Sequence, residues 1–270
     1  MAFRHCPHCQ HHESQQWLER QLKRLVPAEY FLVTFTLPAE LRPLAWAHQG
    51  VVYDLLLRCA WDTVRTFSQN DKQLQGTPGA IAVLHTSTRR LDYHPHAHFV
   101  VPVAALDAAG LALPGRTPKQ WVVDCKSVGS GAAALAYLGR YLYRGVIQEK
   151  DIVACQDGLV TFRYRDAKTG KSEHRTVPGA QFLWLVLQHV LPKGFRRARN
   201  FGFLHPNCKR LIALLQVLLR FVPVRATDWV KLRPPILCVC CGAVMKIVRT
   251  RIAATIVGEP VVPLVVAGAC

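Results

Sequence analysis

Three histidines at alternate positions, in the segment HPHAHFVV, constrain the fold of this chain more than any other feature. On a β-strand, side chains two residues apart point to the same face of the sheet. The segment therefore predicts a strand on which His94, His96 and His98 share one face, while Ala97 and Phe99 pack on the other. Imidazole nitrogens are common ligands of divalent transition metals, so this strand is a candidate metal site. The alternative is a histidine-rich edge strand that binds no ligand.

Pro95 stands between the first two of these histidines. Proline cannot donate a ladder hydrogen bond and is tolerated only at strand starts, at edges or at bulges. We therefore expect His96 and His98 to be the ligand pair, with His94 as a candidate third ligand.

The segments around the histidine strand predict an α+β fold. Apolar spacing predicts a helix over 14–26, with Ser14 as its N-cap. β-Branched and aromatic residues predict strands over 30–38 and 80–87, and a long amphipathic helix over 46–68 separates them. The order strand, helix, strand, strand is that of half a ferredoxin-like sheet, a split βαβ unit. We expect an antiparallel sheet flanked by helices, with the histidines on an inner strand.

A predicted helix over 134–146, ALAYLGRYLYRGV, carries a second group of reactive residues. Tyr137 and Tyr141 stand four residues apart, which places them on one helical face, and Arg140 and Arg144 lie beside them. A phenol is a poor nucleophile at its ordinary pKa of about 10. Nearby cations favour the phenolate, and a metal bound to the target phosphate makes phosphorus easier to attack. Core packing is the alternative explanation for such a tyrosine pair.

The net charge of +17, from 34 Lys and Arg against 17 Asp and Glu, is spread along the chain. Such a charge favours nucleic acid or an anionic membrane surface as partner. The most apolar runs, 182–191 and 211–219, are shorter than the roughly 20 residues that a bilayer requires, and they predict buried helices. The polar, histidine-rich N-terminus lacks the pattern of a signal peptide. We therefore expect nucleic acid, and not a membrane, to be the partner.

Two basic segments are candidates for contact with nucleic acid. Residues 158–177 alternate apolar and polar side chains around a Lys-Thr-Gly-Lys turn, which predicts a β-hairpin with a basic exposed face. An ordinary charged edge is the alternative for this hairpin. Residues 190–210 interleave phenylalanines with basic residues, among them Lys193, Arg196 and Arg197. This mixture suits single-stranded bases that stack and phosphates that are neutralised.

Two CxxC pairs, Cys6 with Cys9 and Cys238 with Cys241, each have the spacing of half a zinc site. A structural zinc site needs four ligands, and the sequence leaves open whether the two pairs combine. We therefore expect small zinc-knuckle appendages on the main fold.

The combination of motifs resembles a known family. HPHAHFVV, followed later by YLGRYLYR, is similar to the signature of the HUH nuclease superfamily, which has two histidines around a hydrophobic residue and one or two tyrosines on a later helix. More narrowly, the chain resembles the two-tyrosine rolling-circle transposases of the insertion sequence ninety-one family. Further matches run in family order, from CPHCQ through LHTSTRRLDYHPHAHFVVP, GLVTFRYRDAKTGK and HVLPKGFRRARNFGFL to LCVCCG.

The resemblance implies a role for each matched residue. His96 and His98 would hold a divalent cation, Mg²⁺ or Mn²⁺, against the scissile phosphate of single-stranded DNA. Tyr137 would attack that phosphate and form a 5′-phosphotyrosine, and Tyr141 would serve the second cleavage, so that the chain nicks and rejoins transposon ends. The expected DNA contacts are Arg140, Arg144, Lys193, Arg196 and Arg197, and the expected Zn²⁺ ligands are Cys6, Cys9, Cys238 and Cys241.

The resemblance also implies three regions: a remnant of an N-terminal zinc-binding region with a helix over 1–27, an HUH nuclease domain over 28–205, and a helical, CxxC-containing segment over 206–270. Because the chain begins almost at its first knuckle, we expect a shortened N-terminal region. The expected location is the bacterial cytoplasm, in association with the nucleoid, and the oligomeric state is left undefined. Two alternatives stay open: an inactive remnant that only binds DNA, and a plasmid-type replication initiator or relaxase.

Overall fold

The computed structural model divides the chain into two compact units, Met1–Val230 and Lys231–Cys270, which we describe separately. The described residues are 7–106, 111–112, 125–143, 145–167, 169–221 and 236–245. Within these ranges, no helix combines the length and the apolar character that are needed to cross a membrane.

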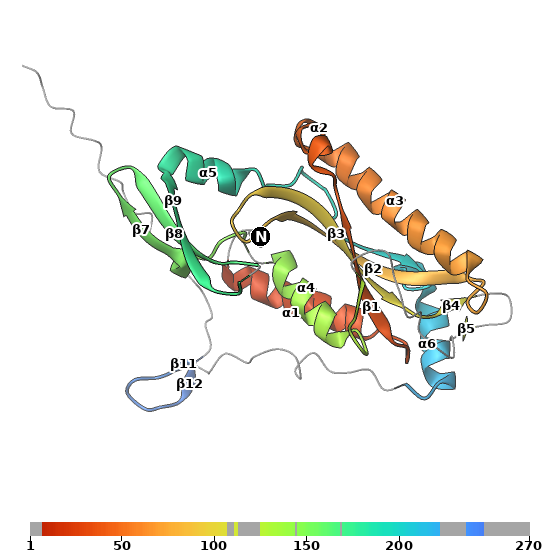
Figure 1. The fold of residues 1–270 in the computed structure, drawn as a ribbon. Helices are drawn as coiled ribbons and strands as arrows, with labels where there is room; N and C mark the ends of the chain where they lie inside the picture. The colour runs from red at the N-terminus through yellow and green to blue at the C-terminus, as the bar shows by residue number, and fades with distance from the viewer. Residues whose placement is uncertain are drawn as a thin grey trace, which may run out of the picture. The chain divides into compact units, whose positions relative to one another are not determined.

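The histidine strand, β3 (Tyr93–Pro102), is an inner strand of an antiparallel sheet that comprises seven strands of the described residues (Figure 1). β3 pairs with β1 (Tyr30–Thr36) along one edge and with β2 (Thr77–Ser87) along the other. β1 and β2 therefore run parallel to each other, and the long helix α3 (Gln49–Asn70) lies between them in the chain, as in a split βαβ unit. The remaining strands extend the two sides: β6 (Cys125–Ser127) pairs with β1, β10 (Ala198–Gly202) and β4 (Ala105–Leu106) pair with β2, and β5 (Leu111–Ala112) pairs with β4. The prediction of an α+β fold with an antiparallel sheet flanked by helices is confirmed.

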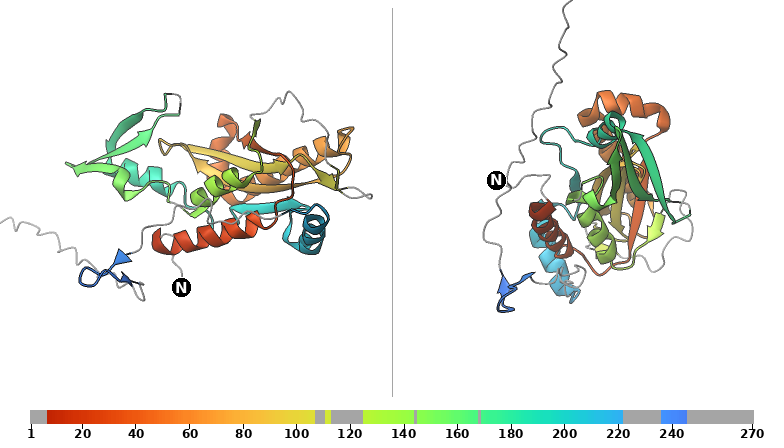
Figure 2. Two further views of the ribbon diagram at one scale, coloured as in Figure 1. Left: turned by 90° about the horizontal axis from the view of Figure 1, so that it is seen from below. Right: turned by 90° about the vertical axis from the view of Figure 1, so that its left-hand side faces the viewer.

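Two helices, α1 (Pro7–Leu22) and α4 (Ala132–Tyr143), lie side by side on one face of the sheet (Figure 2). Gly139 of α4 allows their close approach, since a Cβ atom there would lie 3.1 Å from the Trp17 ring of α1. Ser14 lies inside α1, so its assignment as an N-cap is wrong. Its hydroxyl donates instead to the carbonyl of Gly139, 2.9 Å away. This contact ties the two helices together and helps to fix the rotation of α4 about its axis.

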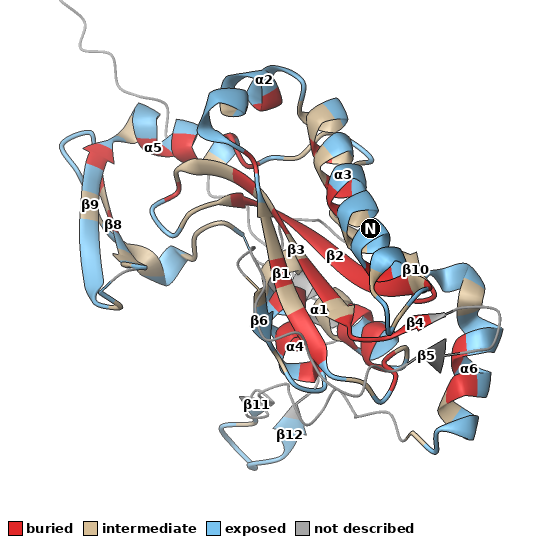
Figure 3. Cartoon of the chain, turned by 45° about the vertical axis from the view of Figure 1, so that its right-hand side comes forward, coloured by how far each residue is buried: buried red, intermediate tan, exposed pale blue. Residues whose placement is uncertain are grey.

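Alternation along the strands decides which helices each side chain meets. Ala97 and Phe99 of β3 share a core cluster with Leu57 of α3, so α3 covers that face of the sheet. On the opposite face, alternate residues of β2 and β3 form a cluster with α1 and α4: Ile81, Val83 and Val100 with Trp17, Leu135 and Leu138. The strands between these layers are largely buried, whereas the outer sides of the helices are exposed (Figure 3). Because the histidines alternate with Ala97 and Phe99, they point to the side that α4 covers.

A second, three-stranded sheet follows α4. It consists of β7 (Ile152–Gln156), β8 (Leu159–Arg165) and β9 (Ser172–Pro178), and it leads into α5 (Gly179–Leu187). The predicted hairpin is confirmed as β8 and β9, whereas β7 was not predicted. Leu91, in the turn between β2 and β3, belongs to the core of this small sheet.

The last helix among the described residues of the first unit is α6 (Lys209–Leu218), which we expected in a separate C-terminal segment. It packs within the first unit, because Ile212 joins the core cluster of α1 and α4 and Gln216 donates to the carbonyls of Lys23 and Leu25. In the second unit, β11 (Ile236–Leu237) and β12 (Val244–Met245) form a hairpin. The short segments are η1 (Ala39–Leu41), α2 (Arg42–Ala47), η2 (Glu149–Asp151) and η3 (Pro206–Cys208).

Candidate active site

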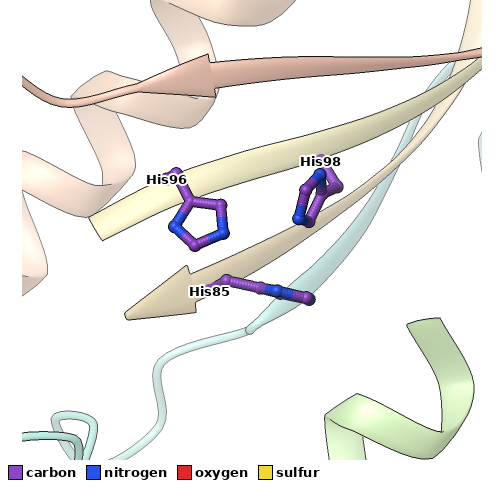
Figure 4. A group of neighbouring side chains, drawn as sticks. All are labelled: His85, His96 and His98. Carbon is purple, nitrogen blue, oxygen red and sulfur yellow. The ribbon is translucent and has the colours of Figure 1, made fainter. Parts of the chain in front are cut away.

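Three histidines converge near the turn that joins β2 to β3 (Figure 4). His96 and His98 come from β3, and His85 of β2 lies opposite His96 in the strand register. One ring nitrogen of each histidine lies within 4.8 Å of the corresponding nitrogens of the other two. We predicted His96 and His98 but missed His85. Its alternation with Val83 could have placed it on the correct face, although not beside His96.

His94 does not belong to this cluster. Its Nδ1 lies 2.8 Å from Nη2 of Arg42 in α2, and because a guanidinium can only donate, this nitrogen accepts the hydrogen bond. The lone pair of that nitrogen is therefore already used. The His94 carbonyl has a different role, since it lies 2.7 Å from Nδ1 of His96 and accepts its hydrogen bond. Among the described residues, the third histidine beside His96 and His98 is therefore His85 and not His94.

The hydrogen bonds of the two β3 histidines engage the same nitrogen, Nδ1, on each ring. Nδ1 of His96 donates to the His94 carbonyl, and Nδ1 of His98 lies 2.9 Å from the hydroxyl oxygen of Thr34 on β1. When Nδ1 carries the proton, Nε2 keeps a lone pair for a metal. Metal-binding histidines are usually held in this way, by a hydrogen bond from the ring nitrogen that does not bind the metal.

The chemistry of the cluster fits a divalent cation. His85 is 2% exposed, and its Nε2 has no hydrogen-bond partner among the described residues. Burial lowers the pKa of His85 well below its usual range, with further contributions from His98 and His96. Burial also lowers the pKa of His96, and it lowers the pKa of His98 to about 4. Three neutral imidazoles with nitrogens close together can share one metal ion, and binding would satisfy the buried nitrogen of His85.

Tyr141 of α4 lies directly against this cluster. Its ring is stacked on the imidazole of His85, with 3.4 Å between the ring centroids and 15° between the ring planes. Its hydroxyl lies 2.9 Å from the hydroxyl of Ser87, which is two residues beyond His85 on β2. The guanidinium of Arg197 lies over the tyrosine ring, 4.7 Å from its centroid. The phenol is therefore held by three neighbours beside the candidate metal ligands.

Arg197 is held by two hydrogen bonds to the backbone of Leu84 in β2. Its Nε donates to the carbonyl of Leu84 at 3.0 Å, and its own carbonyl accepts a hydrogen bond from the Leu84 amide at 2.9 Å. Burial lowers the pKa of the guanidinium, an effect that the nearby Tyr141 opposes. We expected Arg197 to contact DNA, and the structure places its guanidinium over the Tyr141 ring, where it also lines the cavity.

Tyr137 lies one helical turn before Tyr141 and is 49% exposed. Both tyrosines line a cavity of about 900 Å³ together with the three clustered histidines. Among the described residues, the charged side chains that line this cavity are five arginines and one aspartate: Arg89, Arg140, Arg163, Arg165, Arg197 and Asp151. The cavity therefore brings together candidate nucleophiles, candidate metal ligands and an excess of positive charge among its described lining residues.

Comparisons with known proteins agree with this arrangement. Residues 79–114 and 111–211 match the family described as "Putative transposase", and residues 2–37 match the "Transposase zinc-binding domain". The chain is 32% identical over 257 residues to the "Putative transposase y4qJ" of Sinorhizobium fredii, which covers 74% of this chain and 65% of that protein. It is 26% identical over 302 residues to the "Transposase for insertion sequence element IS801" of Pseudomonas savastanoi pv. phaseolicola, which covers 90% of this chain and 73% of that protein.

The chain belongs to the insertion sequence ninety-one family of transposases. It spans 65% of the length of the first of these relatives and 73% of the second. No solved structure matches it.

The zinc-binding domain of this transposase family matches the region of the first predicted knuckle. Cys6 lies outside the described residues, and the structure places Cys9 in α1 without describing its side chain. In the second unit, Cys238 and Cys241 lie in the turn between β11 and β12, where the Gly242 amide donates to the Cys238 carbonyl at 2.9 Å. Hydrogen bonds from the backbone of Cys241 and of Cys240 lower the pKa of the Cys238 thiol, which favours the thiolate that binds zinc.

The remaining residues that we expected to contact DNA occupy different positions. Arg140 is exposed and lines the cavity beside the two tyrosines. Lys193 and Arg196 are exposed in the connection between α5 and β10. Arg144 lies outside the described residues.

Proposed function

We propose that this transposase cuts and rejoins single-stranded DNA through a covalent tyrosine–phosphate intermediate, with its active site in the cavity of the central region over 28–205. The observation that carries the proposal is the contact between Tyr141 and His85, which joins the tyrosine helix to the histidine cluster. An inner strand with His96-Ala97-His98, covered by a helix with two tyrosines, is the arrangement that the resemblance to HUH nucleases implies.

The charge and shape of the cavity support a single-stranded substrate. In the part of the chain that the structure describes, five arginines line the cavity against one aspartate. This balance suits a phosphodiester backbone, whose phosphates each carry a negative charge. The histidine cluster is recessed, since His85 is almost fully buried. A single strand can bend its backbone into such a recess, whereas the paired bases of a duplex would hold the phosphates outside it.

The chemistry follows from the positions of the side chains. When bound, a divalent cation on the histidine cluster would polarise the scissile phosphate and offset the charge that develops on its oxygens. The phenolic oxygen of Tyr141 attacks phosphorus, the bond to the 3′-oxygen breaks, and a 5′-phosphotyrosine and a free 3′-hydroxyl result. The phenolic proton ends on the departing 3′-oxygen. Attack of another 3′-hydroxyl on the phosphotyrosine joins the strand to a new partner.

The assignment of the first nucleophile differs from our expectation. We expected Tyr137 to attack first, but the contacts of Tyr141 with His85 and Ser87 favour Tyr141 in this role. Tyr137, more exposed and one turn away, would serve the second strand end. Two tyrosines in one cavity allow two ends to be held and exchanged.

The cysteine pairs would have a structural role. Cys238 and Cys241 would bind Zn²⁺ as thiolates, and Cys6 and Cys9 would do so in the region that matches the zinc-binding domain.

Metal-dependent nicking tests the proposal against its alternatives. A labelled single strand that carries an end of the element should be cut in Mn²⁺ and left intact in EDTA. Binding without cutting under both conditions would indicate a DNA-binding remnant. Cutting at a plasmid replication or transfer origin, with no cutting at element ends, would indicate an initiator or relaxase.

A further inference from the structure

The cavity extends from the tyrosines to the small sheet. Four consecutive residues of β8 line it: Phe162, Arg163, Tyr164 and Arg165. Phe162 is buried in the core of the small sheet, whereas Arg163 and Arg165 are exposed and Tyr164 is partly exposed. β8 therefore contributes one partly exposed aromatic ring and two exposed cationic side chains to the wall of the cavity.

Hydrogen bonding fixes the ring of Tyr164. Its hydroxyl donates to Oε2 of Glu173 at 2.8 Å, and these residues are direct partners in the β8–β9 register. The guanidinium of Arg90 lies over the ring, 5.8 Å from its centroid. A ring held in one orientation loses little conformational freedom when a flat ligand stacks on it.

The small sheet is also fixed relative to the histidine cluster, through the turn between β2 and β3. Arg175 of β9 donates to the Asp92 carboxylate at 2.8 Å and to the Arg90 carbonyl at 2.7 Å. Gln188 donates to the Leu91 carbonyl at 2.7 Å. Because this turn connects His85 to His96, the turn places Tyr164 at a defined distance from the candidate metal ligands.

We propose that Tyr164 is the stacking platform for an unpaired base next to the scissile phosphate, and that Arg90 and Arg165 neutralise the phosphates on either side of that base. The proposal rests on the proposed function, since it names the part of the single strand that the wall holds. Aromatic rings interleaved with cationic side chains are the usual means of binding single strands without sequence preference. The subsite therefore recognises an extrahelical base of any kind.

Binding of a fluorescent thymidine homopolymer, measured by anisotropy in EDTA, tests the subsite without requiring cleavage. Tyr164→Ala should weaken binding by about 5- to 150-fold, the range known for the loss of one stacked base. Tyr164→Phe should keep most of the wild-type affinity, because the ring remains although the hydrogen bond that orients it is lost. Phe67→Ala is the matched control, since Phe67 is an exposed aromatic residue near the end of α3 and does not line the cavity. Binding of the same oligomer as a duplex with its complement should not change in Tyr164→Ala, because paired bases cannot stack on the ring.

A strand with one abasic position sharpens the test. In a series of strands, the abasic position is placed at each position in turn. The affinity of wild type should fall most for one of these strands, and the same strand should lower the affinity of Tyr164→Ala only slightly. Equal binding of Tyr164→Ala and wild type would overturn the proposal, and so would an equal loss in Tyr164→Phe. If wild type binds through Tyr164 but never cuts in Mn²⁺, the nuclease function fails while the subsite stands. If wild type cuts in Mn²⁺ but neither binding nor cutting depends on Tyr164, the subsite fails while the nuclease function stands.

Discussion

The phenol ring of Tyr141 lies flat on the imidazole of His85, with 3.4 Å between the ring centroids. The contact joins residues that are far apart in the sequence and that belong to different layers of the fold. It arises because the alternation of β2 turns His85 toward α4, and the crossing of α1 and α4 at Gly139 fixes the rotation of that helix. The proposed nucleophile and a candidate metal ligand thereby meet in one cavity.

His85 should be a metal ligand of equal importance to the predicted pair. Replacement of His85 by alanine should lower Mn²⁺ affinity by at least the roughly 10- to 100-fold that is typical for residues that only support ligands. Titration followed by electron paramagnetic resonance of free Mn²⁺ measures this affinity. His94→Ala serves as the comparison, and it should retain more affinity than His85→Ala, since His94 lies outside the cluster. A lower Mn²⁺ affinity for His94→Ala than for His85→Ala would indicate that His94 is a metal ligand.

Thr34 should influence the metal site through its hydrogen bond to His98. Thr34→Val keeps the shape of the side chain but removes the hydroxyl, so Nδ1 of His98 loses the partner that fixes its proton. We expect Mn²⁺ affinity to fall roughly tenfold. Thr63→Val removes a hydroxyl that bonds a carbonyl within α3, and it should leave affinity unchanged. Equal affinities for all three proteins would show that Thr34 has no part in orienting His98.

Arg197 should contribute to stability as well as to the position of Tyr141. Arg197→Gln removes the cation over the ring and the hydrogen bond to the Leu84 carbonyl. We expect a loss of about 1–3 kcal/mol in the free energy of unfolding, because a buried carbonyl loses its partner. Urea denaturation measures this loss. Arg196→Gln, at an exposed neighbour, should change stability by less than about 0.5 kcal/mol. A similar small change for Arg197→Gln would mean that its contacts are not maintained in solution.

Tyr30 should make the protein sensitive to alkaline pH. Burial raises its pKa, although the hydrogen bond from the Val26 amide opposes this effect. In the unfolded chain this phenol ionises at about pH 10, whereas in the folded protein it keeps its proton to higher pH. The stabilisation is therefore complete below about pH 10 and is lost as pH rises further, by up to about 1.4 kcal/mol per pH unit.

The Tyr30→Phe protein provides the control for this pH dependence. It lacks the titrating hydroxyl, so its unfolding free energy should fall less steeply than that of wild type above about pH 10. Denaturant unfolding at several alkaline pH values gives both slopes. Identical slopes would show that the Tyr30 phenol is not protected from ionisation by the fold.

Local periodicity predicted much of this site. The period of two along β3 put His96 and His98 on one face, and the spacing of four along α4 put Tyr137 and Tyr141 together. Both predictions depend only on the conformation of a single element. The main strands and helices around them follow from apolar patterns of the same kind.

The residues that were missed, or whose surroundings were not anticipated, depend on contacts between elements. To place His85 in the cluster, one needs the register of β2 against β3. To place Arg197 beside Tyr141, one needs the pairing of β10 with β2, and β10 is a short basic strand without apolar alternation. His94 had the right spacing, but Arg42, which comes from α2, takes its ring nitrogen. Sequence periodicity contains none of these long-range distances.

The central claim is that Tyr141 forms a covalent bond to DNA beside the histidine cluster. Intact-protein mass spectrometry after incubation with a single-stranded element end and Mn²⁺ tests it directly. Wild type and Tyr137→Phe should gain the mass of the 3′ fragment of the strand, whereas Tyr141→Phe and His96→Ala should gain none. An adduct that forms in Tyr141→Phe as readily as in wild type, or no adduct in wild type under conditions in which the strand is cut, would contradict the account.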